Sequence, residues 1–202
     1  MKHTELDKKY YIIEVDGANN HPLLAWGNAD SDPFDEETKI EEEELEFPIK
    51  VVFDDPYPSQ YEMADLLSLG TIYAVSEKLK NLFESNNVYG VQFFPVEIET
   101  DKENIETGHY IMHFWNLLPA IDKNNFEGTI DKIGLVRNLK RFSVDEKLLD
   151  SIPFENRKVI RLEENPIMLL VHQDIYEAIK AEKLIGISFF RVDEWNTGSM
   201  FR

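Results

Sequence analysis

Histidine and carboxylate side chains are the residues of this sequence whose types and spacing suggest chemistry. His109 and His113 are four residues apart, the spacing at which two histidines of one helix bind zinc. The glutamate that follows the first histidine of a zinc peptidase is missing, and the apolar neighbours predict a strand. At roughly 3.3 Å per residue, the two imidazoles of a strand are about 13 Å apart. We therefore expect a structural or surface role for both histidines.

A calcium site is the second chemical possibility, because Asp30 and Asp32 offer the oxygen ligands that calcium prefers. An EF-hand loop that began at Asp30 would need an oxygen ligand at position 5 and glycine at position 6. The sequence has Phe34 and Asp35 there. The EF-hand pattern is therefore not met, and we expect neither a metal nor a cofactor.

The catalytic patterns are also missing from the sequence. The chain has 39 acidic residues, so no two of them stand out as the carboxylate pair of a glycosidase. No serine lies in a Gly-x-Ser-x-Gly motif, and the nine glycines form no phosphate-binding loop. We predict that the protein is not an enzyme and has no catalytic residues. A hydrolase that uses carboxylates is a lower-ranked alternative.

Negative charge is concentrated in residues 28–46, which we call the acidic segment and expect to be a loop. It has ten acids and one base, a net charge of −9, whereas the whole chain has −18. Such a field accelerates the approach of a basic partner. We predict that the partner-binding residues are Asp30, Asp32, Asp35, Glu36, Glu37, Glu41, Glu42, Glu43 and Glu44.

A basic stretch, residues 132–161, has eight bases and four acids. Two alternatives to partner binding therefore stay open for the acidic segment. It can be a solvated loop without a binding role, or it can pair with the basic stretch of its own chain.

The composition indicates the class of protein. With 202 residues and 43% apolar residues, the chain is long enough for one globular domain that spans residues 1–202. The net charge of −18 repels phosphate backbones, so we expect no nucleic-acid partner. The sequence has no cysteine and no run of about 20 apolar residues. We expect a cytoplasmic protein without membrane contact.

Two similar segments dominate the pattern of predicted elements. Residues 72–97 align on residues 168–193 without a gap, and each copy reads as strand, helix, strand. Both copies have apolar residues at i, i+4, i+7 and i+8 of the predicted helix, so one helix face should be buried. These residues are Val75, Leu79, Leu82 and Phe83 in the first copy and Val171, Ile175, Ala178 and Ile179 in the second.

Other patterns predict further elements. Strands are expected at residues 9–15, 23–26, 48–53, 110–117, 130–142 and 158–162, and short helices at 61–69 and 144–152. Strands outnumber helices. The predicted fold class is α+β, with a mixed β-sheet, a few short helices and two similar strand-helix-strand units at 72–97 and 168–193.

These motifs resemble a known family. The residues Val-Ser-Glu-Lys-Leu-Lys at 75–80, Gly-Val-Gln-Phe-Phe at 90–94 and Val-His-Gln-Asp-Ile-Tyr at 171–176 are similar to those of immunity proteins of bacterial polymorphic toxin systems. That family was first catalogued as a domain of unknown function with a myxobacterial prototype. The resemblance covers about residues 61–192.

The resemblance implies a cytoplasmic toxin inhibitor that acts in bacterial competition. Such a protein binds one cognate toxin domain and neutralises it by stoichiometric occlusion. Many toxin domains act on nucleic acid or nucleotides, so the expected partner has a basic active-site surface. The main alternative is an acidic adaptor domain that binds a partner without inhibiting it.

Overall fold

The computed structural model describes residues 2–16, 20–27, 34, 38–41, 45, 47–54, 60–100 and 104–199. Within these ranges there are thirteen strands, three α-helices and two short 3-10 helices, η1 (Asp7–Lys9) and η3 (Phe154–Arg157). The predicted α+β class with mixed sheets is confirmed.

The elements of the N-terminal half are β1 (Tyr10–Val15), β2 (Leu24–Trp26), β3 (Ile49–Phe53), β4 (Leu66–Leu69), β5 (Ile72–Ser76), α1 (Glu77–Ser85) and β6 (Val91–Glu99). Those of the C-terminal half are β7 (Ile105–Phe114), β8 (Leu117–Leu118), β9 (Ile121–Ile130), β10 (Val136–Val144), α2 (Glu146–Ser151), β11 (Val159–Leu162), β12 (Leu169–His172), α3 (Gln173–Ala181) and β13 (Ile187–Arg191).

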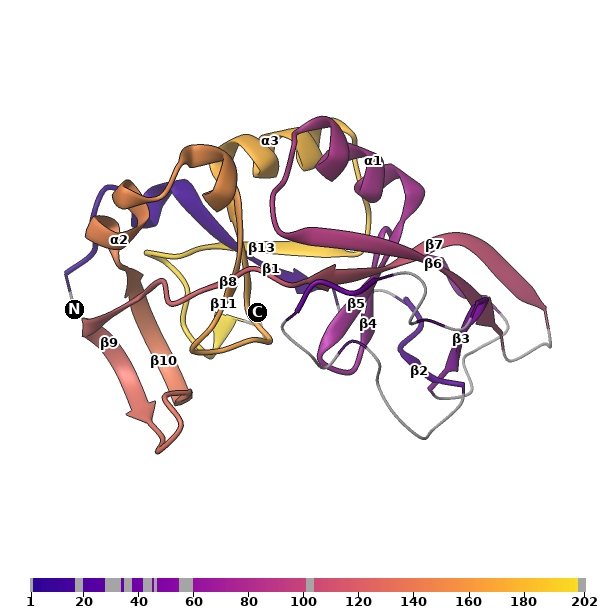
Figure 1. Ribbon diagram of the computed structural model, residues 1–202, viewed down its shortest axis with the longest axis horizontal. Helices are drawn as coiled ribbons and strands as arrows, with labels where there is room; N and C mark the ends of the chain where they lie inside the picture. The colour runs from indigo at the N-terminus through magenta and orange to yellow at the C-terminus, as the bar shows by residue number, and fades with distance from the viewer. Residues whose placement is uncertain are drawn as a thin grey trace.

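The strands form a closed barrel, a five-stranded sheet and a hairpin. The barrel has the order β2-β3-β6-β7-β5-β4, and the five-stranded sheet has the order β13-β1-β12-β11-β8. Strands β9 and β10 pair only with each other. In Figure 1, α1 and α3 lie side by side along one edge of the molecule, and the hairpin and the barrel extend away from them.

The two strand-helix-strand units are built with the same register. In each unit a central antiparallel strand lies between the two parallel strands, β7 in the first unit and β1 in the second. The pairings agree position by position: Tyr110 pairs with Val75 and Pro95, and Tyr11 pairs with Val171 and Arg191. The sequence echo therefore corresponds to a real structural repeat.

The central strands are exchanged between the two halves of the chain. Strand β7 begins the C-terminal half but completes the sheet of the first unit, and β1 begins the N-terminal half but completes the sheet of the second. Equivalent backbone hydrogen bonds in the two units link the end of the central strand to the glycine before the last strand. Trp115 N donates to Gly90 O and Asp16 N donates to Gly186 O, each at 3.0 Å. Each half therefore contributes its first strand to the other.

Local sequence explains the start of both helices and the turns after them. Ser76 caps α1 by accepting from Leu79 N at 3.3 Å, and the His172 imidazole accepts from Asp174 N of α3 at 3.3 Å. Gly90 and Gly186, which precede β6 and β13, have φ values of +81° and +76°. A side chain is strained at such angles, so glycine is needed at both positions.

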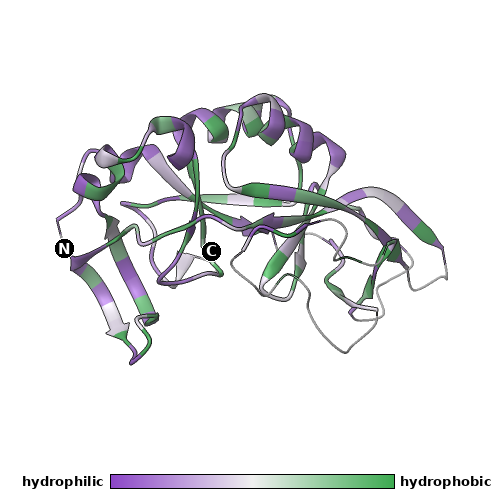
Figure 2. Cartoon of the chain, viewed as in Figure 1, coloured by the Kyte–Doolittle hydropathy of each residue, from purple (hydrophilic) through white to green (hydrophobic). Residues whose placement is uncertain are grey.

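A shared core lies between the two units. The apolar faces of α1 and α3 pack against each other and against the central strands, with Ile13 from β1 and Met112 from β7. Of the eight echoed positions, seven are buried and Ala178 is half-buried. Figure 2 shows hydrophobic and hydrophilic residues alternating around both helices, as an amphipathic helix requires.

Two expected elements were wrong. The helix expected at 61–69 ends instead in strand β4, because residues 66–69 pair with β5, with Leu67 in the barrel core and Leu66 in the core shared by the two units. The single strand expected at 130–142 is broken at Asp131–Leu135, where a turn joins β9 to β10. In both segments the secondary structure depends on pairing with another strand, which the local sequence pattern does not reveal.

No described helix is long and apolar enough to span a membrane.

Candidate partner-binding site

The two histidines that suggested a metal pair are structural. His109 is 8% exposed and its Nε2 lies 3.2 Å from Ala64 O, and His113 is fully buried with its Nε2 2.7 Å from Thr38 O. Each imidazole therefore bonds to a different backbone carbonyl. Among the described residues, no group of three or more His, Asp or Glu side chains is placed to bind a metal ion.

The structure describes one of the nine predicted partner-binding residues, Glu41, whose side chain is exposed. The other eight lie outside the described residues: Asp30, Asp32, Asp35, Glu36, Glu37, Glu42, Glu43 and Glu44. The structure therefore does not test the predicted site directly. It does describe Phe34, Thr38–Glu41 and Leu45, which lie between these acids in the sequence.

Phe34 attaches the acidic segment to the barrel core. Its ring is 1% exposed and stacks on Trp26 of β2, with ring centroids 5.7 Å apart. It also packs against Phe94 and His113 of β6 and β7, at 5.3 and 5.8 Å. Burial of a phenylalanine stabilises this attachment by roughly 1.5–3 kcal/mol. Phe34 itself is therefore anchored in the barrel core.

A second attachment point lies at β6. Ile40 N donates to the Gln92 side-chain oxygen at 3.0 Å, and the Gln92 amide donates back to Ile40 O at 2.8 Å. Together with the hydrogen bond between His113 Nε2 and Thr38 O, these bonds satisfy backbone polar groups of residues 38–40, which lie outside the strands. The exposed Glu41 follows directly, so its carboxylate is open to solvent beside this attachment point.

Charge is divided unevenly between the two halves of the chain. Residues 1–100 contain 22 acids and seven bases, a net charge of −15, and residues 101–202 account for the remaining −3. A partner with a basic surface is therefore attracted to the N-terminal half of the chain, which contains five of the six barrel strands.

Part of the basic stretch is neutralised locally. Arg137 pairs with Asp131 at 2.9 Å, Arg157 pairs with Asp150 at 3.5 Å, and Lys158 pairs with Glu155. These three bases bond to acids that are close to them in sequence.

A second acidic run was missed in the sequence. Residues 96–107 contain five acids and one base, a signal that was present in the composition. The run includes the end of β6 and the start of β7, both barrel strands. Glu99 is exposed there, and Ile105 beside it is 58% exposed. The barrel therefore presents additional carboxylates besides those of the acidic segment.

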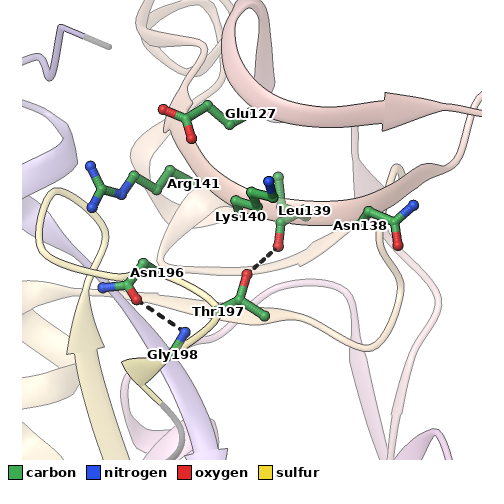
Figure 3. Close-up of a pocket in the computed structure, with 8 residues that line it drawn as sticks. All are labelled: Glu127, Asn138, Leu139, Lys140, Arg141, Asn196, Thr197 and Gly198. Atoms are coloured by element: carbon green, nitrogen blue, oxygen red, sulfur yellow. Dashed lines mark hydrogen bonds between the residues drawn. The ribbon is translucent and has the colours of Figure 1, made fainter.

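A pocket lies elsewhere, between β10 and the C-terminal turn. Its volume is about 630 Å³, and Figure 3 shows its lining: Glu127, Asn138, Leu139, Lys140, Arg141, Asn196, Thr197 and Gly198. The Thr197 hydroxyl donates to Leu139 O at 2.7 Å, so it is not an activated nucleophile. The lining offers polar contacts but no pair of nucleophile and base.

Comparison with known proteins identifies the group to which these features belong. The model of the Imm11 immunity protein family matches residues 6–194, which include the acidic segment and both strand-helix-strand units. No curated protein matches the chain.

Proposed function

Because the chain belongs to the Imm11 immunity protein family, we propose that it binds one cognate antibacterial toxin domain and neutralises it by stoichiometric occlusion. The family match supports an immunity function. The toxin, the binding surface and the neutralisation by occlusion are the parts of the proposal that need experiments. We expect the interaction to take place in the cytoplasm.

The observation that carries the binding surface is the charge of the N-terminal half of the chain, which contains five of the six barrel strands. The net charge of −15 in residues 1–100 suits a toxin whose active-site surface is basic, as expected of an enzyme that acts on nucleic acid. The acidic segment is attached to the barrel at Phe34 and Ile40. We therefore expect its acids to stay close to the barrel when the partner approaches. We therefore propose that the acidic segment faces the toxin.

Inhibition should depend on the ratio of the two proteins. The test needs a toxin gene next to this chain's gene, whose presence itself supports an immunity function. When the purified product of that gene is titrated with the protein, toxin activity should fall linearly and end at one inhibitor per toxin. Inhibition by catalytic amounts of the protein would contradict occlusion. Tight binding without inhibition would favour an acidic adaptor domain instead.

The acidic segment should govern the rate of association. Replacement of Glu41, Glu42, Glu43 and Glu44 by Gln should slow toxin association by roughly 10-fold or more at low salt, because a local field raises such rates by about 10–10³-fold. The loss should shrink at 1 M salt, where the Debye length is about 3 Å. Stopped-flow mixing at two salt concentrations measures both effects.

A matched control has the same change of charge in the other half: Glu146, Glu163, Glu177 and Glu182, all exposed, replaced by Gln. Equal slowing by both sets would mean that only net charge matters. Unchanged association in the first set would remove the acidic segment from the binding site. A lower unfolding free energy with unchanged association would mean that the segment pairs with its own chain.

A further inference from the structure

The β9–β10 hairpin forms a sheet of its own. Its strands pair only with each other, and Figure 1 shows it extending on the same side as the barrel, away from α1 and α3. Strand β10 packs against the body along its length, because Val136, Leu139, Phe142 and Val144 are buried in a core cluster and Val136 N donates to Glu164 O at 2.7 Å. The end of β9 and the turn, by contrast, are exposed from Glu127 to Ile130 and from Lys132 to Gly134.

The turn at the end of the hairpin is rigidly built around Asp131. One carboxylate oxygen accepts from Ile133 N and Leu135 N, both at 3.0 Å, and the other accepts from Arg137 Nε at 2.9 Å. Desolvation acts to raise the pKa of Asp131, but these bonds and the charge of Arg137 outweigh it, so the pKa is lowered. The carboxylate is therefore ionised at neutral pH and holds the turn in one conformation.

This turn presents an apolar side chain to water. Ile133 is 78% exposed, more than any other exposed large hydrophobic residue of the described chain, and Ile130 beside the turn is 47% exposed. A rigid turn loses little conformational entropy when it binds. An exposed isoleucine on such a turn can therefore enter a pocket of a partner at a low ordering cost.

The turn places one base, Lys132, beside Ile133, since Arg137 is paired with Asp131. The hairpin, residues 121–142, has five bases and three acids in a chain with a net charge of −18. Lys132 directly precedes Ile133 and is exposed, and it forms no ion pair with the described residues. A partner that suits this turn must combine an apolar pocket with carboxylates at its border.

We propose that the β9–β10 turn docks into the cognate toxin, with Ile133 in an apolar pocket of the toxin that acidic residues border. This inference rests on the proposed function. The hairpin and the barrel extend to the same side, so one toxin domain can contact both (Figure 1). The region of the toxin that faces the acidic segment is then basic, and the region that faces the hairpin is acidic.

The test is Ile133→Asp, which removes the apolar contact and places a carboxylate against the acidic border. With the purified product of the adjacent toxin gene as the probe, dissociation should become roughly 30-fold faster or more, as for an interface residue at the centre of a contact. The matched control is Ile167→Asp, since Ile167 is also an exposed isoleucine, at 58%. It should leave dissociation unchanged.

The outcomes separate the two proposals. No binding by the wild-type chain would overturn the proposed function. Wild-type binding with unchanged dissociation of Ile133→Asp would overturn the docking role of the turn alone. Equal losses in Ile133→Asp and Ile167→Asp would also overturn it. Because both side chains are exposed, both variants should melt at the wild-type temperature, and a lower melting point of Ile133→Asp calls for Ile133→Ser in its place.

The charge of the border is tested separately with Lys132→Glu. This variant should weaken binding by several-fold, and more at low salt than at high salt. Tighter binding of Lys132→Glu would overturn the acidic border.

Discussion

Replacement of Leu79 or Ile175 by alanine is expected to lower the free energy of unfolding by about 2–5 kcal/mol in each case. The two side chains are 1% and 0% exposed and occupy equivalent positions on α1 and α3. Both lie in the core cluster that the two units share, so either truncation leaves a cavity where α1 and α3 pack. Urea denaturation, followed by circular dichroism, measures the loss.

The control for both variants is Ile185→Ala, which removes the same groups from a side chain that is 38% exposed. It should cost clearly less, because water already reaches the side chain. A wild-type urea midpoint for Leu79→Ala and Ile175→Ala would mean that the repeated apolar positions do not mark the core.

The second large effect is expected at Asp7. Its side chain is fully buried and accepts hydrogen bonds from Thr4 N at 2.8 Å, from Ser143 Oγ at 2.7 Å and from Val144 N at 2.8 Å. Replacement by alanine leaves these donors without an acceptor, each at a cost of about 1–3 kcal/mol when buried. We expect Asp7→Ala to lower the unfolding free energy by about 3 kcal/mol or more.

The neighbouring Glu5 provides the control for Asp7. Its side chain is 83% exposed and pairs only with Lys8, so Glu5→Ala should change stability by less than about 1 kcal/mol. Asp7→Asn should also destabilise, because its amide nitrogen is a donor and would face other donors. Full stability of Asp7→Asn would contradict the role of the carboxylate.

The repeated pattern predicted the centre of the fold. The spacing of Val75, Leu79 and Phe83 is local information, and the same spacing recurs at Val171, Ile175 and Ile179. Amphipathic helices next to strands can be read from one sequence for this reason.

Strand pairing could not be read in the same way. The exchange of β1 and β7 depends on which distant segments pair, and the similarity of Tyr11-Ile12 to Tyr110-Ile111 is too short to reveal it. Strand β9 was missed because Asp122 to Asn125 are polar residues that disfavour strands, and here β10 supplies the pairing.

The candidate site was predictable in part. The acidic segment is evident from charge alone, and the match of residues 6–194 extends the family to the N-terminal sixty residues, where no resemblance was expected. The anchors Phe34 and Ile40 could not be found from the sequence, because each is a single apolar residue among acids. The exposed Ile133 was missed because it was assigned to a continuous strand.

The exchanged strands have a consequence for the synthesis of the protein. Strand β1 is completed near the beginning of translation, but its partners β12 and β13 end at His172 and Arg191. The nascent chain therefore holds an unpaired edge strand until almost the whole polypeptide has left the ribosome. A product truncated after β7 contains all strands of the first unit but no partner for β1, so the second unit and the core that the two helices share form only when the C-terminal strands have been made.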